Sequence, residues 1–149
     1  MKIGIEIVKS LEALVDSEEN LIANLANTSS LLMSSGNYHW VGFYFVDKEQ
    51  DELVLGPFQG PIACTRLKRG RGVCAKSWES KKTIYVEDVE SFEGHIACSS
   101  LSKSEVVIPL IVKDEVVAVL DIDSAEIQGF SLSEISIFES IVKVIQAKW

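Results

Sequence analysis

The chain has 149 residues, of which 47% are hydrophobic and 24% are charged, and its formal net charge is −8. This length and composition predict a single domain, spanning residues 1–149, with a hydrophobic core and no long disordered segment. The acidic balance argues against nucleic acid as a partner, because phosphate binding requires clustered Lys and Arg side chains.

The N-terminal stretch contains no signal-peptide core, because Glu6, Lys9 and Glu12 interrupt its apolar residues. No segment approaches the roughly 18 consecutive apolar residues of a membrane span. We therefore expect a cytoplasmic protein with no membrane partner. In that compartment thiols are kept reduced, and a disulfide is usually transient or catalytic.

Two helices are predicted in the first third of the chain. Asp16 or Ser17 is the expected N-cap of the second helix, with Glu19 placed for a capping box. The first helix is indicated by apolar residues at helical spacing, namely Ile5, Val8, Leu11 and Val15.

The middle of the chain predicts β-structure, and the end predicts a helix. A short helix is expected at 73–80, with Cys74 near its start, and a long loop at 87–103. A helix is expected at 132–148, where Ser131 and Glu134 form a capping box. Strands are predicted from β-branched and aromatic runs at 38–46, 52–58, 61–67, 83–86, 104–112 and 115–123. This order predicts an α+β fold, with an antiparallel sheet, terminal helices on one face and functional loops on the other.

Three cysteines lie within 35 residues, namely Cys64, Cys74 and Cys98. Each could be a small buried hydrophobic residue. An odd number of thiols in a cytosolic chain fits thiol chemistry better than a structural disulfide framework. The N-terminus of a helix lowers a thiol pKa, which would favour a Cys74 thiolate. A zinc site made of the three cysteines and His95 is disfavoured, because no cysteine pair has the two-to-four-residue spacing of zinc ligands.

Three acids interrupt two otherwise apolar strands, namely Glu105, Asp121 and Asp123. Alternation places Asp121 and Asp123 on one face of their strand. They could simply be strand ends that reach solvent. Alternatively, the three acids form one cluster that binds a cation, for which the ammonium group of a ligand is suitable.

The turn between these strands provides a test of that cluster. With a two-residue turn at 113–114 and no irregularity, Glu105 falls opposite Ile122, on the face away from the aspartates. A one-residue shift puts Glu105 opposite Asp123 on the shared face. Pro109 is a plausible place for such a bulge, because it cannot donate a hydrogen bond to the ladder.

Aromatic residues are concentrated in the strand predicted at 38–46. Most of them, including Tyr44, are interpreted as core residues. Trp40 lies at the beginning of the strand, close to the loops, and is the best candidate for the wall of a small apolar pocket.

Six segments together resemble a known family: NYHWVGFYF, LVLGPFQGPIACTRL, GRGVCAKS, VEDVESFEGHIACSS, SKSEVVIPL and AVLDIDS. In this order they are similar to the free methionine-(R)-sulfoxide reductases, which are stand-alone GAF domains. The resemblance implies a GAF fold and reduction of free methionine (R)-sulfoxide, with electrons from thioredoxin. It implies no cofactor and no metal, and it leaves a homodimer open. The chain departs from the family at Ser99 and at Ala75-Lys76, and Lys76 could favour a thiolate at Cys74.

The resemblance also implies roles for particular residues. Cys98 is the expected nucleophile and Cys64 its main resolving partner, whereas Cys74 has been given either role. Substrate binding is expected from four residues, namely Trp40, Glu105, Asp121 and Asp123.

Physical reasoning adds a mechanism to this family pattern. A thiolate of Cys98 would attack the sulfoxide sulfur while one of the acids, held protonated by its neighbours, donates a proton to the oxygen. The resulting sulfenic acid would condense with Cys64 to a disulfide, which thioredoxin reduces. The main alternative is a GAF domain that senses a small ligand, or a thiol redox sensor without a substrate pocket.

Overall fold

The computed structural model describes residues 3–94 and 101–149. In this part of the chain, the strands form one antiparallel sheet in the order β3-β2-β1-β6-β5-β4. The elements in chain order are α1 (Glu6–Val15), α2 (Leu21–Ser35), β1 (Trp40–Asp47), β2 (Glu52–Gln59), β3 (Arg66–Lys68), α3 (Gly72–Ser80), β4 (Ile84–Val86), a 3-10 turn (Val89–Ser91), β5 (Ser104–Val112), β6 (Glu115–Ser124) and α4 (Leu132–Gln146).

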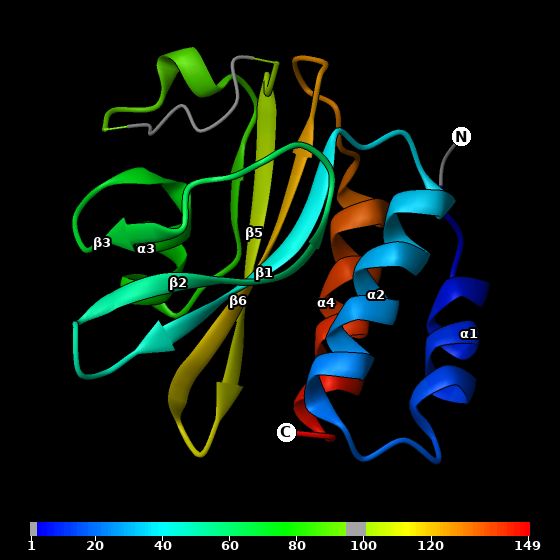
Figure 1. Ribbon diagram of the computed structural model, residues 1–149. Helices are drawn as coiled ribbons and strands as arrows, with labels where there is room; N and C mark the ends of the chain where they lie inside the picture. The colour runs from blue at the N-terminus through cyan, green and yellow to red at the C-terminus, as the bar shows by residue number, and fades with distance from the viewer. Residues whose placement is uncertain (1–2, 95–100) are drawn as a thin grey trace.

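The helices lie on both faces of the sheet, but unequally. Helices α1, α2 and α4 cover one face, whereas α3 and connecting loops lie on the other (Figure 1). Alternate residues of the central strands, such as Phe43 and Leu120, are fully buried against the three-helix layer. The residues between them point toward α3. The predicted α+β arrangement is confirmed, and the α3 face is the one that carries the candidate site.

The predicted start of α4 is confirmed, whereas the predicted N-cap of α2 is not. The capping box before α4 is confirmed, because Ser131 Oγ accepts from the Glu134 N–H at 3.2 Å and Glu134 Oε2 accepts from the Ser131 N–H at 2.8 Å. The predicted N-cap of α2 is wrong. Asn20, rather than Asp16 or Ser17, caps this helix, since its side chain accepts a hydrogen bond from the first turn.

The β5–β6 pairing contains the register shift that the three-acid cluster requires. Glu105 pairs with Asp123, and the register shifts by one residue between Leu110 and Ile111. Pro109 and Leu110 both stay in register, so the predicted bulge at Pro109 is wrong and the irregularity follows Leu110. The shift places Glu105 on the same face as Asp123, and the prediction of a shared face is confirmed.

Two other predicted segments differ from the structure. Only the last two residues of the segment predicted as a strand at 61–67 belong to a strand, β3, because the residues before them form a loop that runs past the pocket on the α3 face. In α1 the buried face includes Ile7 rather than Ile5, whose side chain is 62% exposed. No helix in the described ranges combines the length and apolar character that crossing a membrane requires.

Candidate active site

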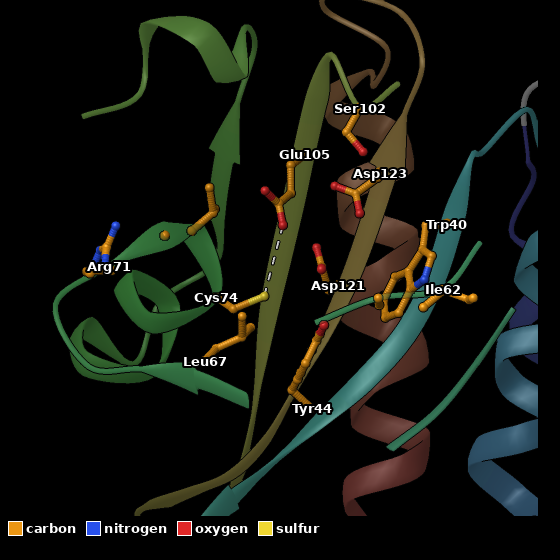
Figure 2. Close-up of a pocket in the computed structure, with 13 residues that line it drawn as sticks. Trp40, Tyr44, Ile62, Leu67, Arg71, Cys74, Ser102, Glu105, Asp121 and Asp123 are labelled. Atoms are coloured by element: carbon orange, nitrogen blue, oxygen red, sulfur yellow. Dashed lines mark hydrogen bonds between the residues drawn. The ribbon is translucent and has the colours of Figure 1, made fainter. Parts of the chain in front are cut away.

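A pocket opens on the α3 face of the sheet (Figure 2). Its walls come from the strands β1, β5 and β6, the first turn of α3 and the loop that follows β2. The lining residues are Trp40, Tyr44, Ile62, Ala63, Leu67, Arg71, Gly72, Val73, Cys74, Ser102, Glu105, Asp121 and Asp123. The structure therefore brings together five of the seven predicted site residues, which are Trp40, Cys74, Glu105, Asp121 and Asp123.

Strand pairing explains why the three acids meet. Glu105 of β5 pairs with Asp123 of β6, and Asp123 pairs on its other side with Trp40 of β1. Asp121 lies two residues from Asp123 and so shares its face. Glu105 and Asp121 are only 7% and 5% exposed. The alternative that these acids are strand ends reaching solvent is excluded for both residues.

Burial dominates the electrostatics of the acid cluster. It raises the pKa of Asp121 from 3.8 to about 8, with a further contribution from the nearby charge of Asp123. Burial and Asp121 raise the pKa of Glu105, while burial and Glu105 raise the pKa of Asp123. One oxygen of the cluster, Asp121 Oδ1, is buried without a hydrogen-bond partner in the described structure. These carboxyl groups are therefore held protonated unless a cation joins them.

Cys74 lies directly beside these acids. Its side chain is buried, its thiol is free, and Sγ lies 4.0 Å from Glu105 Oε2. Burial raises the pKa of the thiol, and the charges of Asp121 and Glu105 raise it further. The prediction that the helix start and Lys76 favour a Cys74 thiolate is wrong. Lys76 is exposed, whereas two acids from distant strands lie close to the sulfur.

Aromatic rings form the opposite wall of the pocket. The Trp40 ring stacks on Phe58 at 5.2 Å and on Tyr44 at 5.9 Å between centroids, and its Nε1 donates to the Pro61 carbonyl at 3.1 Å. Gly42 makes this stacking possible, because a Cβ there would collide with Phe58 and lie 2.6 Å from Trp40 Cη2. The predicted position of Trp40 at an apolar wall is confirmed.

Of the remaining two cysteines, Cys64 lies within the described residues and Cys98 does not. Cys64 is disulfide-bonded, and its carbonyl accepts a hydrogen bond of 2.9 Å from the Tyr44 hydroxyl, which anchors its backbone to the edge of the pocket. Its neighbour Ala63 lines the pocket. Cys98, the predicted nucleophile, lies outside the described residues, as does His95.

The sequence interpretation missed several lining residues. Tyr44 is a buried core residue, as predicted, but it also lines the pocket, and its pKa is raised by burial and by Asp121. The period of two that joins Trp40, Gly42 and Tyr44 along β1 could have revealed it. Ile62, Leu67, Arg71 and Ser102 carried no comparable sequence signal, because loops and edges bring them to the pocket.

The pocket combines two kinds of wall. Buried carboxyl groups on one side can hold a cationic group by charge-assisted hydrogen bonds. Aromatic and aliphatic side chains on the other side can hold a short apolar chain. A small molecule with an ammonium group and an apolar tail fits this arrangement.

Comparisons with known proteins identify the family of the chain. A GAF domain family model matches residues 17–147. GAF domain-containing protein A of Dictyostelium discoideum is 50% identical over 139 residues, covering 93% of this chain and 87% of the relative. The free methionine-R-sulfoxide reductase of Escherichia coli is 46% identical over 127 residues, covering 85% of this chain and 76% of the relative. The chain belongs to the free methionine-R-sulfoxide reductase family of GAF domains.

A solved structure from the same family extends this result to the whole fold. The X-ray structure of free methionine-R-sulfoxide reductase from Neisseria meningitidis, in complex with its substrate, has a TM-score of 0.94 at 43% identity. The match covers 96% of this chain and 86% of the Neisseria chain. The resemblance seen in the sequence, the GAF fold and membership of an oxidoreductase family are therefore confirmed.

Proposed function

We propose that this chain reduces free L-methionine (R)-S-oxide to methionine. One observation carries the proposal, namely the buried cluster of Glu105, Asp121 and Asp123 facing Trp40 across one pocket. The names of the close relatives support the same substrate.

The acid cluster explains why the substrate would be the free amino acid. Its α-ammonium group is the cation that the carboxylates lack, and Asp121 Oδ1 is a buried acceptor that such a group can satisfy. A methionine sulfoxide within a protein has no ammonium group. Binding it would bury the carboxyl groups without a partner, which costs about 1–3 kcal/mol for each unsatisfied group.

The sulfoxide end would lie at the apolar wall. The methyl group is expected to contact the Trp40 ring, which is itself held by Phe58 and Tyr44. Because the rings are fixed on both sides, they can distinguish the position of the methyl group from that of the oxygen. This asymmetry provides a physical reason for selecting one sulfoxide stereoisomer.

The chemical step requires a nucleophile and a proton. We assign the attack to a Cys98 thiolate, which transfers two electrons to the substrate sulfur. One acid of the cluster donates a proton to the sulfoxide oxygen, and the raised pKa of Asp121, about 8, suits a donor at neutral pH. In net terms the oxygen leaves the substrate with that proton and ends on Cys98 as a sulfenic acid, while methionine departs.

Recycling requires a second thiol. We assign Cys64 as the resolving residue, because it is disulfide-bonded in the structure whereas Cys74 is free. Condensation of the Cys64 thiol with the sulfenic acid would release the oxygen as water and form the disulfide. A thioredoxin dithiol would then supply two electrons and two protons by exchange, which fits a reducing compartment such as the cytoplasm. The raised pKa of the Cys74 thiol argues against this residue as the attacking group.

Single-turnover kinetics of cysteine variants test this assignment. Reduced protein is mixed with excess free methionine (R)-sulfoxide without any reductant, and released methionine is quantified. We expect one equivalent from wild type and from Cys64→Ser, and none from Cys98→Ser. Release of methionine by Cys98→Ser at the wild-type rate would show that the nucleophile is another residue.

A further inference from the structure

Three potential metal-ligand side chains converge on one side of the pocket. The sulfur of Cys74, a carboxylate oxygen of Glu105 and a carboxylate oxygen of Asp121 all lie within 4.8 Å of one another. They come from three separate elements, α3, β5 and β6, and Figure 2 shows them pointing toward one another. Each residue is at most 7% exposed. These three residues are called the thiol–carboxylate cluster below.

The spacing of this cluster is close to that of a tetrahedral metal site. With bonds of about 2.3 Å to sulfur and about 2.1 Å to oxygen, two ligands of one zinc ion lie about 3.6 Å apart. The separation of Cys74 Sγ from Glu105 Oε2 is 4.0 Å. A contraction of a few tenths of an ångström, within reach of side-chain rotation, would therefore bring these two atoms into zinc-binding geometry.

A second observation points independently to a missing cation. Asp121 Oδ1 is buried and accepts no hydrogen bond in the described structure, although buried carboxylate oxygens are normally satisfied. A positive group at the cluster would satisfy this acceptor. The ammonium group of a substrate is one such group, and a metal ion is another.

We propose that the thiol–carboxylate cluster of Cys74, Glu105 and Asp121 binds a divalent cation of the zinc class. The functional part of this inference rests on the proposed function. The ion would occupy the place that we assign to the α-ammonium group, and it would therefore act as a reversible inhibitor that competes with free methionine sulfoxide.

The ligand set determines which metals fit. One sulfur ligand with two carboxylates suits Zn²⁺ or Co²⁺, whereas Mg²⁺ and Ca²⁺ prefer ligand sets made of oxygen alone. Three protein ligands leave a fourth tetrahedral position for water. This site differs from the three-cysteine arrangement with His95, since it uses a single thiol and two strand carboxylates.

The experiment reads metal binding directly and needs no turnover. Reduced, metal-free protein is titrated with Co²⁺, whose bond to a thiolate produces a charge-transfer band in the near ultraviolet, and then with Zn²⁺ by calorimetry. We expect one equivalent of either ion, displacement of Co²⁺ by Zn²⁺, and no comparable binding of Mg²⁺. In Cys98→Ser, which is not expected to reduce it, free methionine (R)-sulfoxide should raise the apparent Kd for Zn²⁺ in proportion to its concentration.

Matched variants assign the ligands. Cys74→Ser should abolish the charge-transfer band, and Asp121→Asn should weaken Zn²⁺ binding by more than the roughly 10–100-fold typical of losing a residue that only supports a ligand. Two controls remove the same chemical groups nearby. Cys64→Ser should keep the band, and Asp123→Asn should weaken binding less than Asp121→Asn.

Several results would overturn the inference. The inference is wrong if wild-type protein shows no thiolate–cobalt band, if the band remains in Cys74→Ser, or if Asp121→Asn binds Zn²⁺ as tightly as wild type. The wild-type spectrum decides the question even if the variants do not fold. Metal binding without sulfoxide reduction would refute the proposed function but support the metal site. Sulfoxide reduction without metal binding would support the proposed function but refute the metal site.

Discussion

Replacing Asp121 with asparagine should stabilise the substrate-free protein at alkaline pH. The side chain keeps its shape but loses its charge. In the folded protein Asp121 is only 5% exposed, so its charge would be buried among other acids. Asp121→Asn should also bind the substrate poorly, because it removes a carboxylate that we assign to the ammonium group. Stability and function are therefore expected to change in opposite directions.

The size of the effect follows from the pKa of Asp121. A rise from 3.8 to about 8 spans about four units of about 1.4 kcal/mol each, so full ionisation in the folded state costs about 5–6 kcal/mol. The folded protein keeps the proton to higher pH and so binds more protons than the unfolded chain. Its free energy of unfolding therefore falls as the pH rises from about 4 through about 8. Asp121→Asn should lack this contribution.

Urea unfolding of reduced protein, followed by tryptophan fluorescence between about pH 5 and pH 9, measures the effect. We expect Asp121→Asn to exceed wild type by several kcal/mol at about pH 8 and to show a flatter pH dependence. The control is Asp114→Asn, which removes the same charge from an exposed turn, at a positive φ of 67° that asparagine tolerates. If both variants follow the wild-type pH dependence, burial of the Asp121 charge does not destabilise the fold.

Three further outcomes test the pocket and the thiols. Gly42→Ala should raise KM and lower Tm, because the added Cβ collides with Phe58 and crowds Trp40. Such overpacking typically costs about 1–3 kcal/mol of stability. An unchanged KM would argue that the Trp40 ring does not position the substrate. N-acetylmethionine (R)-sulfoxide should show at least about a tenfold lower kcat/KM than the free amino acid, since it has lost a charge-assisted hydrogen bond; equal values would contradict the role of the acids. With thioredoxin present, Cys74→Ser should retain more steady-state turnover than Cys64→Ser, and the reverse order would assign the resolving role to Cys74.

Local sequence patterns predicted the parts of the fold that depend on neighbouring residues. The capping box at Ser131 and Glu134 and the hairpin from 104 to 123 required only short-range chemistry and strand alternation. The sequence also showed that a register shift between the strands is required for the three-acid cluster, because only a shifted register puts Glu105 and Asp123 on one face. The acid cluster was therefore predictable as a set.

The features that were missed depend on long-range packing. Burial raises the pKa of Cys74, and Asp121 and Glu105, which lie 47 and 31 residues away in the chain, raise it further, so the local helix start was misleading. Leu67 belongs to a strand of three residues, and the preceding loop passes the pocket rather than extending the sheet. Tyr44 is in the core as predicted, but its second role in the pocket wall depends on the placement of α3, which shows which face of the sheet carries the pocket.

The central claim is tested most directly by substrate consumption. The protein is incubated with an equal mixture of the R- and S-sulfoxides of free L-methionine, together with thioredoxin, thioredoxin reductase and NADPH, and the two sulfoxide diastereomers are separated at the end point. We predict complete loss of the R-sulfoxide, an unchanged S-sulfoxide, and one NADPH oxidised per methionine formed. Loss of both diastereomers, or of neither, would contradict a stereospecific reductase for the free amino acid.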